Sequence, residues 1–297
     1  MSTDILSIES KYSVQQELQE ITPLVSFRGL SVYVLQGNNF PETMRLIGRI
    51  RELIFSKHGA GRGELYDLDK LDFGEQAYYQ LIAYDDEEQE LVAAYRFQWG
   101  QVALSAGDQY LRTSTLFDYS DQFRDEILPY AIELGRSVVN DSAKRARFGF
   151  FAIWKGFSQL IQNHANLQYF FGNVTLYKTM NPFAKDILIN YLEHNYKPSS
   201  PKLVGKKDVV YKPRLTSASD AVDYGEIDTP ANRIQKLRSI LKPYDASVPT
   251  IIQTYMATGL RIWFGETVFD NDFGNAHEIG IIIPISSIDD SFRKRFL

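Results

Sequence analysis

An acidic and a basic residue lie inside an otherwise apolar stretch of the chain, residues 132–139, which reads Ile-Glu-Leu-Gly-Arg-Ser-Val-Val. A carboxylate or guanidinium buried in a sheet without a partner costs several kcal/mol. We therefore expect Glu133 and Arg136 each to meet a partner, a ligand or water, which makes this stretch a candidate site. Strict alternation would place the two side chains on opposite faces of a strand, whereas a bulge at Gly135 would let them converge.

The composition limits the kind of chemistry and the kind of partner. The 297 residues include 32 Lys and Arg against 37 Asp and Glu, and the net charge of −5 disfavours nucleic acid as the main partner. The chain has no cysteine, which excludes disulfides, thiolate metal sites and a cysteine nucleophile and fits a cytoplasmic location. Its four histidines are scattered without metal-ligand spacing, so we expect no metal site.

Hydrophobic periodicity predicts a mixed α/β fold. We expect strands at 30–35, 79–84, 91–99, around Glu133, and at 169–176, 260–264 and 279–285. We expect helices at 41–57, 143–166, 182–195, 230–241 and 249–257. No stretch approaches the roughly 20 apolar residues of a membrane-spanning helix.

The same pattern divides the chain into three parts. Residues 1–28 are expected to form an N-terminal arm, 29–200 the core, and 201–297 a C-terminal extension packed on that core. Residues 197–228, rich in Pro, Ser, Lys and Asp, are typical of a linker or surface segment.

Five groups of residues carry a family resemblance. They are Tyr66-Asp67-Leu68-Asp69, Ala94-Tyr95-Arg96-Phe97, Ile132-Glu133-Leu134-Gly135-Arg136-Ser137, Phe151-Ala152-Ile153-Trp154-Lys155-Gly156, and the segment 248–257 taken with 269–276. In this order the sequence resembles the GNAT superfamily branch of acyl-carrier-protein-dependent N-acyltransferases, which make ornithine and glycine lipids and are often labelled putative hemolysins. It also resembles the related acyl-homoserine-lactone synthases.

The resemblance implies a GNAT-like splayed mixed sheet, flanked by helices, in which the strand of Glu133 and the strand near Phe170 part to admit a pantetheine arm. An amino-acid amine would attack a long-chain acyl thioester there, with backbone N–H groups holding the developing oxyanion. Because the amine must be neutral to attack, a base is needed near the opening, and we assign that role to Glu133. Alternatively, Glu133 forms a buried structural ion pair with Arg96 or Arg136.

The acceptor side is assigned by the same resemblance. Arg136 is the second predicted catalytic residue; its guanidinium either binds the substrate carboxylate or locks the loop 66–69 through an aspartate. Asp67, Asp69 and Arg96 are the candidates for substrate binding. Because the two aspartates follow a glycine-rich loop, the sequence alone predicts that they are exposed, solvated or capping residues.

The acyl donor is expected along the end of the Glu133 strand, at Ser137 and Val138. Trp154, on the helix that follows, is a candidate for an acyl tunnel, although helix aromatics are more often core residues.

The run Asp-Ser-Ala-Lys-Arg-Ala-Arg, residues 141–147, stands where CoA-using relatives carry a glycine-rich pyrophosphate loop. Lys144, Arg145 and Arg147 suit a single phosphopantetheine phosphate and an acidic carrier protein, or form an ordinary solvated basic turn.

These inferences give one leading hypothesis and two alternatives. The leading one is a cytoplasmic enzyme without metal or resident cofactor that transfers a long-chain acyl group to a small amino acid such as glycine or ornithine. Acyl carrier protein would supply the thioester as co-substrate, with acyl-CoA as the other possible donor, and peripheral contact with a membrane is left open. The alternatives are an enzyme like the acyl-homoserine-lactone synthases and a GNAT-fold binding protein without turnover.

Overall fold

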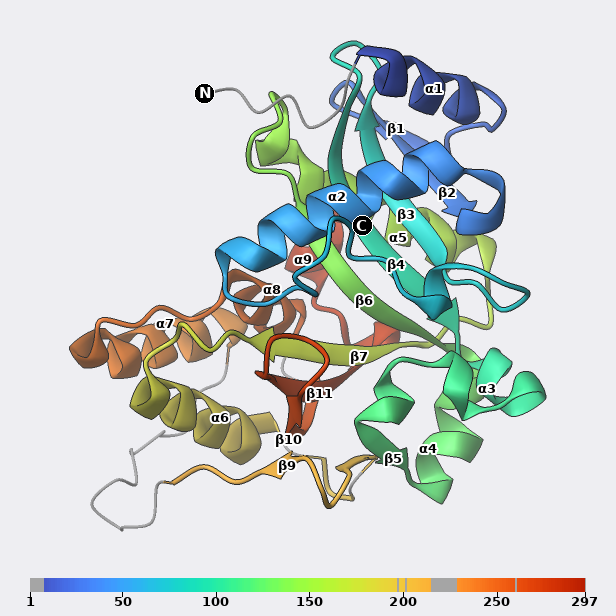
Figure 1. The fold of residues 1–297 in the computed structure, drawn as a ribbon. Coiled ribbons are helices and arrows are strands. Elements are labelled where there is room, and N and C mark those ends of the chain that lie inside the picture. Colours follow the sequence, from blue (N-terminus) through green and yellow to red (C-terminus); the bar gives the residue numbers. More distant parts are fainter. Residues whose placement is uncertain (1–7, 197, 201, 215–228, 260, 297) are drawn as a thin grey trace.

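The computed structural model describes residues 8–196, 198–200, 202–214, 229–259 and 261–296 (Figure 1). Its centre, in this part of the chain, is a nine-stranded sheet in the order β1-β2-β3-β4-β6-β7-β11-β10-β9. These strands are β1 (Val25–Phe27), β2 (Leu30–Gln36), β3 (Tyr79–Asp85), β4 (Glu90–Trp99), β6 (Ala131–Val139), β7 (Tyr169–Leu176), β9 (Val210–Tyr211), β10 (Trp263–Asp270) and β11 (Ala276–Pro284). A separate antiparallel pair is formed by β5 (Phe117–Tyr119) and β8 (Leu203–Gly205).

Helices cover both faces of the sheet (Figure 1). They are α1 (Ile8–Gln19), α2 (Pro41–Lys57), α3 (Gln101–Ala106), α4 (Asp121–Glu126), α5 (Ala146–Asn163), α6 (Pro182–Tyr196), α7 (Pro230–Leu241), α8 (Thr250–Thr258) and α9 (Asp290–Phe296). Alternate residues of one strand serve the two faces: Val32 packs in the core under α5, and Tyr33 in the core under α2. The predicted mixed α/β class is confirmed.

Helix α2 begins at a proline and at a carboxylate that α1 supplies. Pro41 occupies the first position of α2, and the Glu17 carboxylate accepts hydrogen bonds from the backbone N–H groups of Glu42 (2.9 Å) and Thr43 (2.8 Å). A carboxylate at this end of a helix satisfies N–H groups that have no partner within the helix. This contact also attaches α1 to α2 and fixes the helix whose other end reaches the candidate site.

The central strands β6 and β7 are parallel but pair along only part of their length. Four pairs join them, from Ala131–Tyr169 to Leu134–Gly172. Beyond this point β6 continues along β4 as far as Val139, and β7 continues along β11 as far as Leu176. The expected parting of the two strands is therefore present.

A bulge in β6 lies immediately beyond the last pair with β7. Gly135 pairs with Arg96 of β4 and Val138 pairs with Ala94, so two residues of β6 stand opposite Tyr95. Arg136 has a φ of 51°, in the left-handed region that side chains other than glycine rarely adopt. The bulge that the charge pattern suggested is confirmed, one residue further along the chain than Gly135.

The C-terminal segment departs from the sequence prediction at its strands. β10 extends to Asp270 rather than ending at 264, and β11 begins at Ala276 rather than 279. Within the expected linker, residues 203–205 and 210–211 are strands, while 197, 201 and 215–228 lie outside the described residues. Because β11 lies between β7 and β10, segments on both sides of residue 200 share one sheet. The three-part domain division stays a prediction.

We predict that Gly172→Ala weakens the fold by about 2–3 kcal/mol, because it forces apart the two strands at their last pair. A Cβ at Gly172 would lie 2.3 Å from the carbonyl oxygen of Leu134. Gly135→Ala is the matched control, since a Cβ there meets nothing within 4 Å. Urea unfolding of both variants measures the difference, and equal stabilities would contradict the close approach.

Candidate active site

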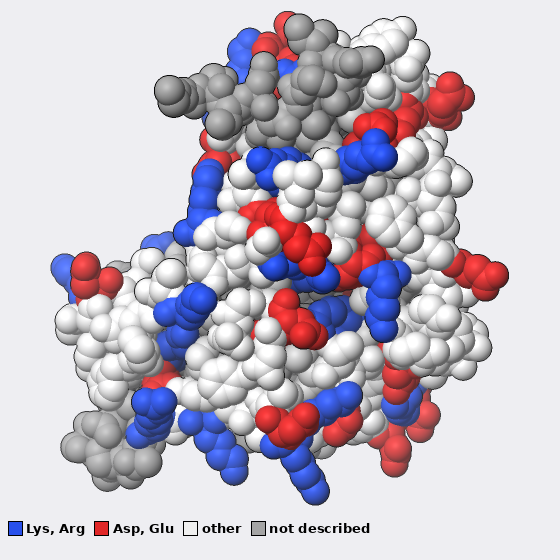
Figure 2. Space-filling model, viewed as in Figure 1, with Lys and Arg blue, Asp and Glu red and all other residues white. Residues whose placement is uncertain are grey.

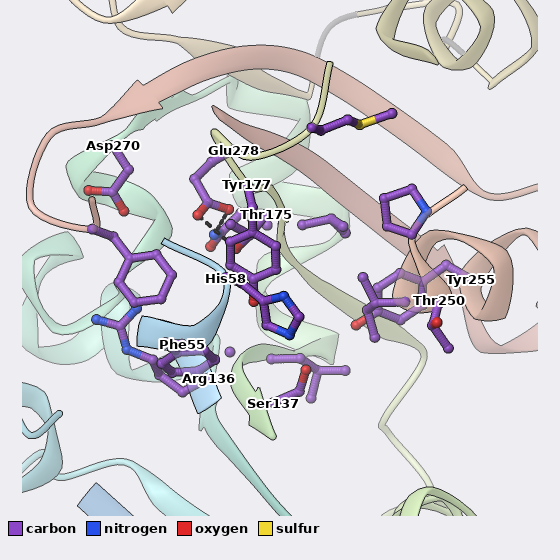
Figure 3. Close-up of a pocket in the computed structure, with 18 of the residues that line it drawn as sticks. Phe55, His58, Arg136, Ser137, Thr175, Tyr177, Thr250, Tyr255, Asp270 and Glu278 are labelled. Atoms are coloured by element: carbon purple, nitrogen blue, oxygen red, sulfur yellow. Dashed lines mark hydrogen bonds between the residues drawn. The ribbon is translucent and has the colours of Figure 1, made fainter. Parts of the chain in front are cut away.

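A cavity of about 560 Å³ opens where β6 and β7 part (Figure 3). It is lined by residues 133–137 of β6, 173–175 of β7 and the segment 245–251 before and within α8. Figure 3 shows Glu278 of β11 on one side and Arg136 and Ser137 of β6 on the other. On the face shown in Figure 2, acidic and basic side chains gather at the centre, over the region of β6 and β7.

An apolar recess of about 170 Å³ adjoins this cavity and shares Tyr95 and Ser137 with it. Its walls come from the middle of β4, the end of β6, α5 and α8. The lining residues are Ala93, Ala94, Tyr95, Ser137, Val138, Val139, Phe150, Ile153, Thr250, Ile251 and Thr254. Two of the predicted donor-site residues, Ser137 and Val138, therefore lie together at a place that suits an apolar chain.

Glu133 lines the cavity, but donors already surround its carboxylate. It is 1% exposed and accepts hydrogen bonds from the backbone N–H groups of Arg112 (3.0 Å) and Thr113 (2.6 Å) and from the Tyr78 hydroxyl. Burial and the Glu133 charge raise the pKa of Tyr78 well above its ordinary value, so this hydroxyl stays a donor. The arrangement favours Glu133 as the anchor of the loop at 112–113.

Arg136 contacts the loop that carries the predicted aspartates. Its Nε lies 3.1 Å from Oδ2 of Asp67, and its Nη2 lies 4.0 Å from Oδ2 of Asp69. The guanidinium also stacks over the ring of Phe273, 4.2 Å from the ring centroid, and burial lowers its pKa. Of the two roles expected for Arg136, binding of a substrate carboxylate and locking of the loop 66–69, the structure shows the contact with the loop.

The expected exposure of the two aspartates is wrong for Asp67, which is 1% exposed. Asp69 is largely buried and caps the short helix at Lys70–Asp72 through the N–H of Leu71, so its capping role is confirmed. Its carboxylate pairs with Arg96 at 2.9 Å. Although burial acts to raise the pKa of Asp69, Arg96 and Arg136 hold it well below its ordinary value. Local sequence could not show these partners, which lie 27 or more residues away.

Glu278 is a second buried carboxylate in the cavity, and the sequence prediction missed it. It is 1% exposed and accepts hydrogen bonds from Asn173 Nδ2 at 2.5 Å and Thr175 Oγ1 at 2.8 Å. Burial, and next the negative charge of Asp270, raise the pKa of Glu278 to about 7. The signal was a charge inside an apolar strand, the same as at Glu133, but the expected strand began one residue too late.

Two more residues near Glu278 were also missed. Arg112 and Asp270 form an ion pair that lines the cavity. Asp270 is the last residue of β10, and a turn follows at 271–275. No local pattern links these two residues, since 158 positions separate them.

The basic run before α5 lies apart from both cavities. Lys144 pairs with Glu88, and Arg145 pairs with Asp85 and Glu87 of the hairpin between β3 and β4. Arg147 is exposed and stacks over the ring of Phe148. None of these three residues lines either cavity.

Trp154 is also outside both cavities. It is 1% exposed and packs edge-on against Phe170 and Phe292 in the core beneath α5. Of the two alternatives for Trp154, an acyl tunnel and the core, the structure shows the core.

Comparison with known proteins identifies the family. The chain is 30% identical to a glycine N(α)-acyltransferase of Bacteroides thetaiotaomicron, over 99% of this chain and 89% of that protein. The chain belongs to this acyltransferase family. It is also 27% identical to a glycine N(α)-acyltransferase of Phocaeicola vulgatus, over 99% of this chain and 92% of that protein. Residues 50–155 match the acetyltransferase (GNAT) domain. The chain is thus an N-acyltransferase of the GNAT superfamily.

Solved structures of acyl-homoserine-lactone synthases show a weaker likeness. The synthase LasI aligns with a TM-score of 0.35 and 13% identity, over 49% of this chain and 72% of that one. The CoA-dependent synthase MesI aligns with a TM-score of 0.39 and 10% identity, over 86% and 88%. At these TM-scores the structural similarity supports no inference about the function of this acyltransferase.

The described residues hold neither a metal cluster nor a membrane-spanning helix. Among them, no three His, Asp or Glu side chains gather in a way that could hold a metal ion. No helix in the same ranges is long and apolar enough to cross a bilayer.

We predict that Glu278→Gln stabilises the acyltransferase above pH 7. The folded state holds a proton on Glu278 up to about pH 7, whereas the unfolded chain releases it near the ordinary value of 4.5. The stability of the native protein therefore falls as the pH rises from 4.5 to about 7. A glutamine at this position is neutral at every pH, so the variant does not lose this stability. We expect Glu278→Gln to exceed the parent protein by about 2–3 kcal/mol at pH 8 and to match it near pH 4.5.

Urea unfolding at the two pH values measures this difference. Glu126→Gln, at an exposed position on α4, is the control and should show no such difference. If Glu278→Gln is less stable than the parent protein at pH 8, the charged Glu278 carboxylate does not destabilise the fold, and the prediction is wrong.

Proposed function

We propose that this acyltransferase moves a long-chain acyl group from the phosphopantetheine thioester of acyl carrier protein to the amine of glycine, in the synthesis of an aminolipid. The observation that carries the proposal is the parting of β6 and β7 beside a charged cavity and an adjoining apolar recess. The proposal has a donor part and an acceptor part, which are supported separately.

The donor part rests on the free edge of β6. Beyond Leu134 this strand no longer pairs with β7, so its backbone faces the opening between them. Backbone N–H groups at such an edge are able to hold the amides of a pantetheine arm and the oxyanion that forms when the thioester is attacked. Ser137 and Val138 would then border the thioester, and the apolar recess would take the uncharged part of the donor.

A carrier protein is favoured over CoA by the turn before α5. The N–H of Ala143 donates to the carbonyl of Asn140 (3.1 Å), and the N–H of Lys144 donates to the carboxylate of Glu90 (3.0 Å). A diphosphate needs such N–H groups at a helix start, together with the helix dipole. Here a carboxylate already takes one of them, and Arg145 is paired with acidic residues.

The acceptor part rests on the charged side of the cavity and on the curated relatives. Both relatives are named glycine N(α)-acyltransferases. The cavity presents Arg112 and Arg136, whose guanidinium groups suit an amino-acid carboxylate even while each holds an aspartate. An acidic group, Glu278, lies in the same cavity on the side opposite Arg136. This pairing of opposite charges matches the two ends of a zwitterionic amino acid.

We predict that the purified enzyme forms N-acylglycine from palmitoyl-acyl carrier protein and glycine. Because the turn at 140–145 offers no free diphosphate cradle, we expect kcat/KM to be at least tenfold lower with palmitoyl-CoA. Mass spectrometry of the products measures the preference for the donor and the preference for the amine. The amines tested include glycine, ornithine and the amine precursor of homoserine lactones. Equal or faster turnover with palmitoyl-CoA would overturn the carrier-protein assignment, and product with other amines alone would overturn glycine.

We predict that Thr254→Trp raises the KM for the acyl donor at least tenfold, because the indole fills the apolar recess that Thr254 lines. The KM for glycine should stay within a factor of two, since Thr254 does not line the charged cavity. Gln235→Trp, at an exposed position of α7, is the matched control. A variant with an unchanged donor KM would show that the recess is not part of the donor site.

A further inference from the structure

The reaction requires a group that removes a proton from the incoming amine. The ammonium of glycine must lose one proton before its nitrogen can attack, and the family relationship does not say which residue takes it. The candidate must line the cavity, must be able to change its ionisation near neutral pH, and must not be neutralised by a fixed positive charge.

Four carboxylates line the cavity within the described residues, and they differ in their partners. Glu133 accepts three hydrogen bonds, two of them from backbone N–H groups. Asp270 is paired with the guanidinium of Arg112, and Asp245 is exposed at the rim. Glu278 is buried, and the two hydrogen bonds it accepts come from the neutral side chains of Asn173 and Thr175.

We propose that Glu278 is the catalytic base that accepts the proton of the acceptor amine. This assignment deepens the proposed function and rests on it for the identity of the amine. It replaces Glu133, the base expected from the sequence, and leaves Glu133 as the anchor of the loop at 112–113.

The proton balance of the step is as follows. The ammonium transfers one proton to the Glu278 carboxylate, and the free amine attacks the thioester carbonyl carbon. The C–N bond forms, the C–S bond breaks, and the departing thiolate takes the second proton released as the nitrogen becomes an amide. Glu278 then passes its own proton to solvent, so that each turnover yields one amide, one thiol and one proton.

The charges around Glu278 place its ionisation in the right range. Burial and Asp270 raise the pKa, while Asn173, Thr175 and Arg112 oppose the rise, and the result is about 7. A base with a pKa near the working pH is partly ionised and still basic enough to draw a proton from an ammonium.

The other titratable side chains facing Glu278 do not compete for this role. Burial, and next the charge of Glu278, raise the pKa of the Tyr177 phenol to about 12, so Tyr177 stays neutral. His58 stacks on Tyr177 with ring centroids 4.9 Å apart, but it is exposed at the mouth of the cavity. His58 is nevertheless the rival that the experiment has to exclude.

The test is the pH profile of kcat/KM for glycine with palmitoyl-acyl carrier protein. For the parent enzyme we expect a rate that rises about tenfold per pH unit below pH 7 and then levels off. Glu278→Gln should lower kcat at pH 7.5 at least 100-fold and abolish the inflection near pH 7. Glu278→Asp, which keeps the carboxylate but shortens its reach, should restore part of the rate and retain an inflection.

Two further variants separate the base from its neighbours. Thr175→Val removes a hydrogen bond that favours the charged form of Glu278, so the inflection should move upward by about half a pH unit while the rate above it is largely kept. His58→Asn should leave the profile unchanged. Circular dichroism and thermal unfolding check that each variant is folded.

The outcomes distinguish the two proposals. If Glu278→Gln keeps the inflection, the role of Glu278 is overturned while the acyl transfer stays intact. The same conclusion follows if the inflection is lost in His58→Asn and kept in Glu278→Gln. If glycine is not accepted, the same profiles are measured with the amine that is. An enzyme that acylates no amine from either donor would overturn both proposals.

Discussion

The separation of β6 from β7 after the pair Leu134–Gly172 is the constraint on which the site depends. Each strand is held on its other side: β6 by β4 as far as Val139, and β7 by β11 over eight pairs. Closing the gap would therefore require each strand to move together with the neighbour to which it is hydrogen-bonded, so the opening is built into the sheet. The bulge at Arg136 adds to the separation, because an extra residue in one strand bends it and increases its local twist.

The charges at the opening follow from the same geometry. Glu133 and Glu278 are both carboxylates inside apolar strands, yet their partners differ in kind. Glu133 accepts hydrogen bonds from the backbone N–H groups of the loop at 112–113. Glu278 has neutral donors and the nearby charge of Asp270, so burial keeps its proton up to about pH 7. One carboxylate therefore fixes a loop, while the other is able to exchange a proton.

Periodicity predicted α2, because burial of one face imposes apolar residues at every third or fourth position. It also located Glu133 and Arg136, since charge in an apolar strand is visible locally. The sequence prediction failed where the partner of a residue is distant in the chain. Asp67 was expected to be exposed because its partner, Arg136, lies 69 positions away. Glu278 was missed because the apolar run after it was taken as the whole strand. The strands at 79–84 and 91–99 were predicted, but the pairing of Arg145 with Asp85 and Glu87 between them was not.

A raised pKa at Glu278 also explains how the empty site avoids a buried, unpaired charge. Without substrate, burial favours the neutral acid below about pH 7. An ammonium entering the cavity supplies a positive charge beside the carboxyl, which lowers its pKa and favours the ionised form that the reaction needs. Once the amide has formed, that positive charge is gone and the carboxyl again holds its proton until solvent removes it. The substrate itself thus generates the base, and the cost to stability accumulates as the pH rises from about 4.5 to about 7.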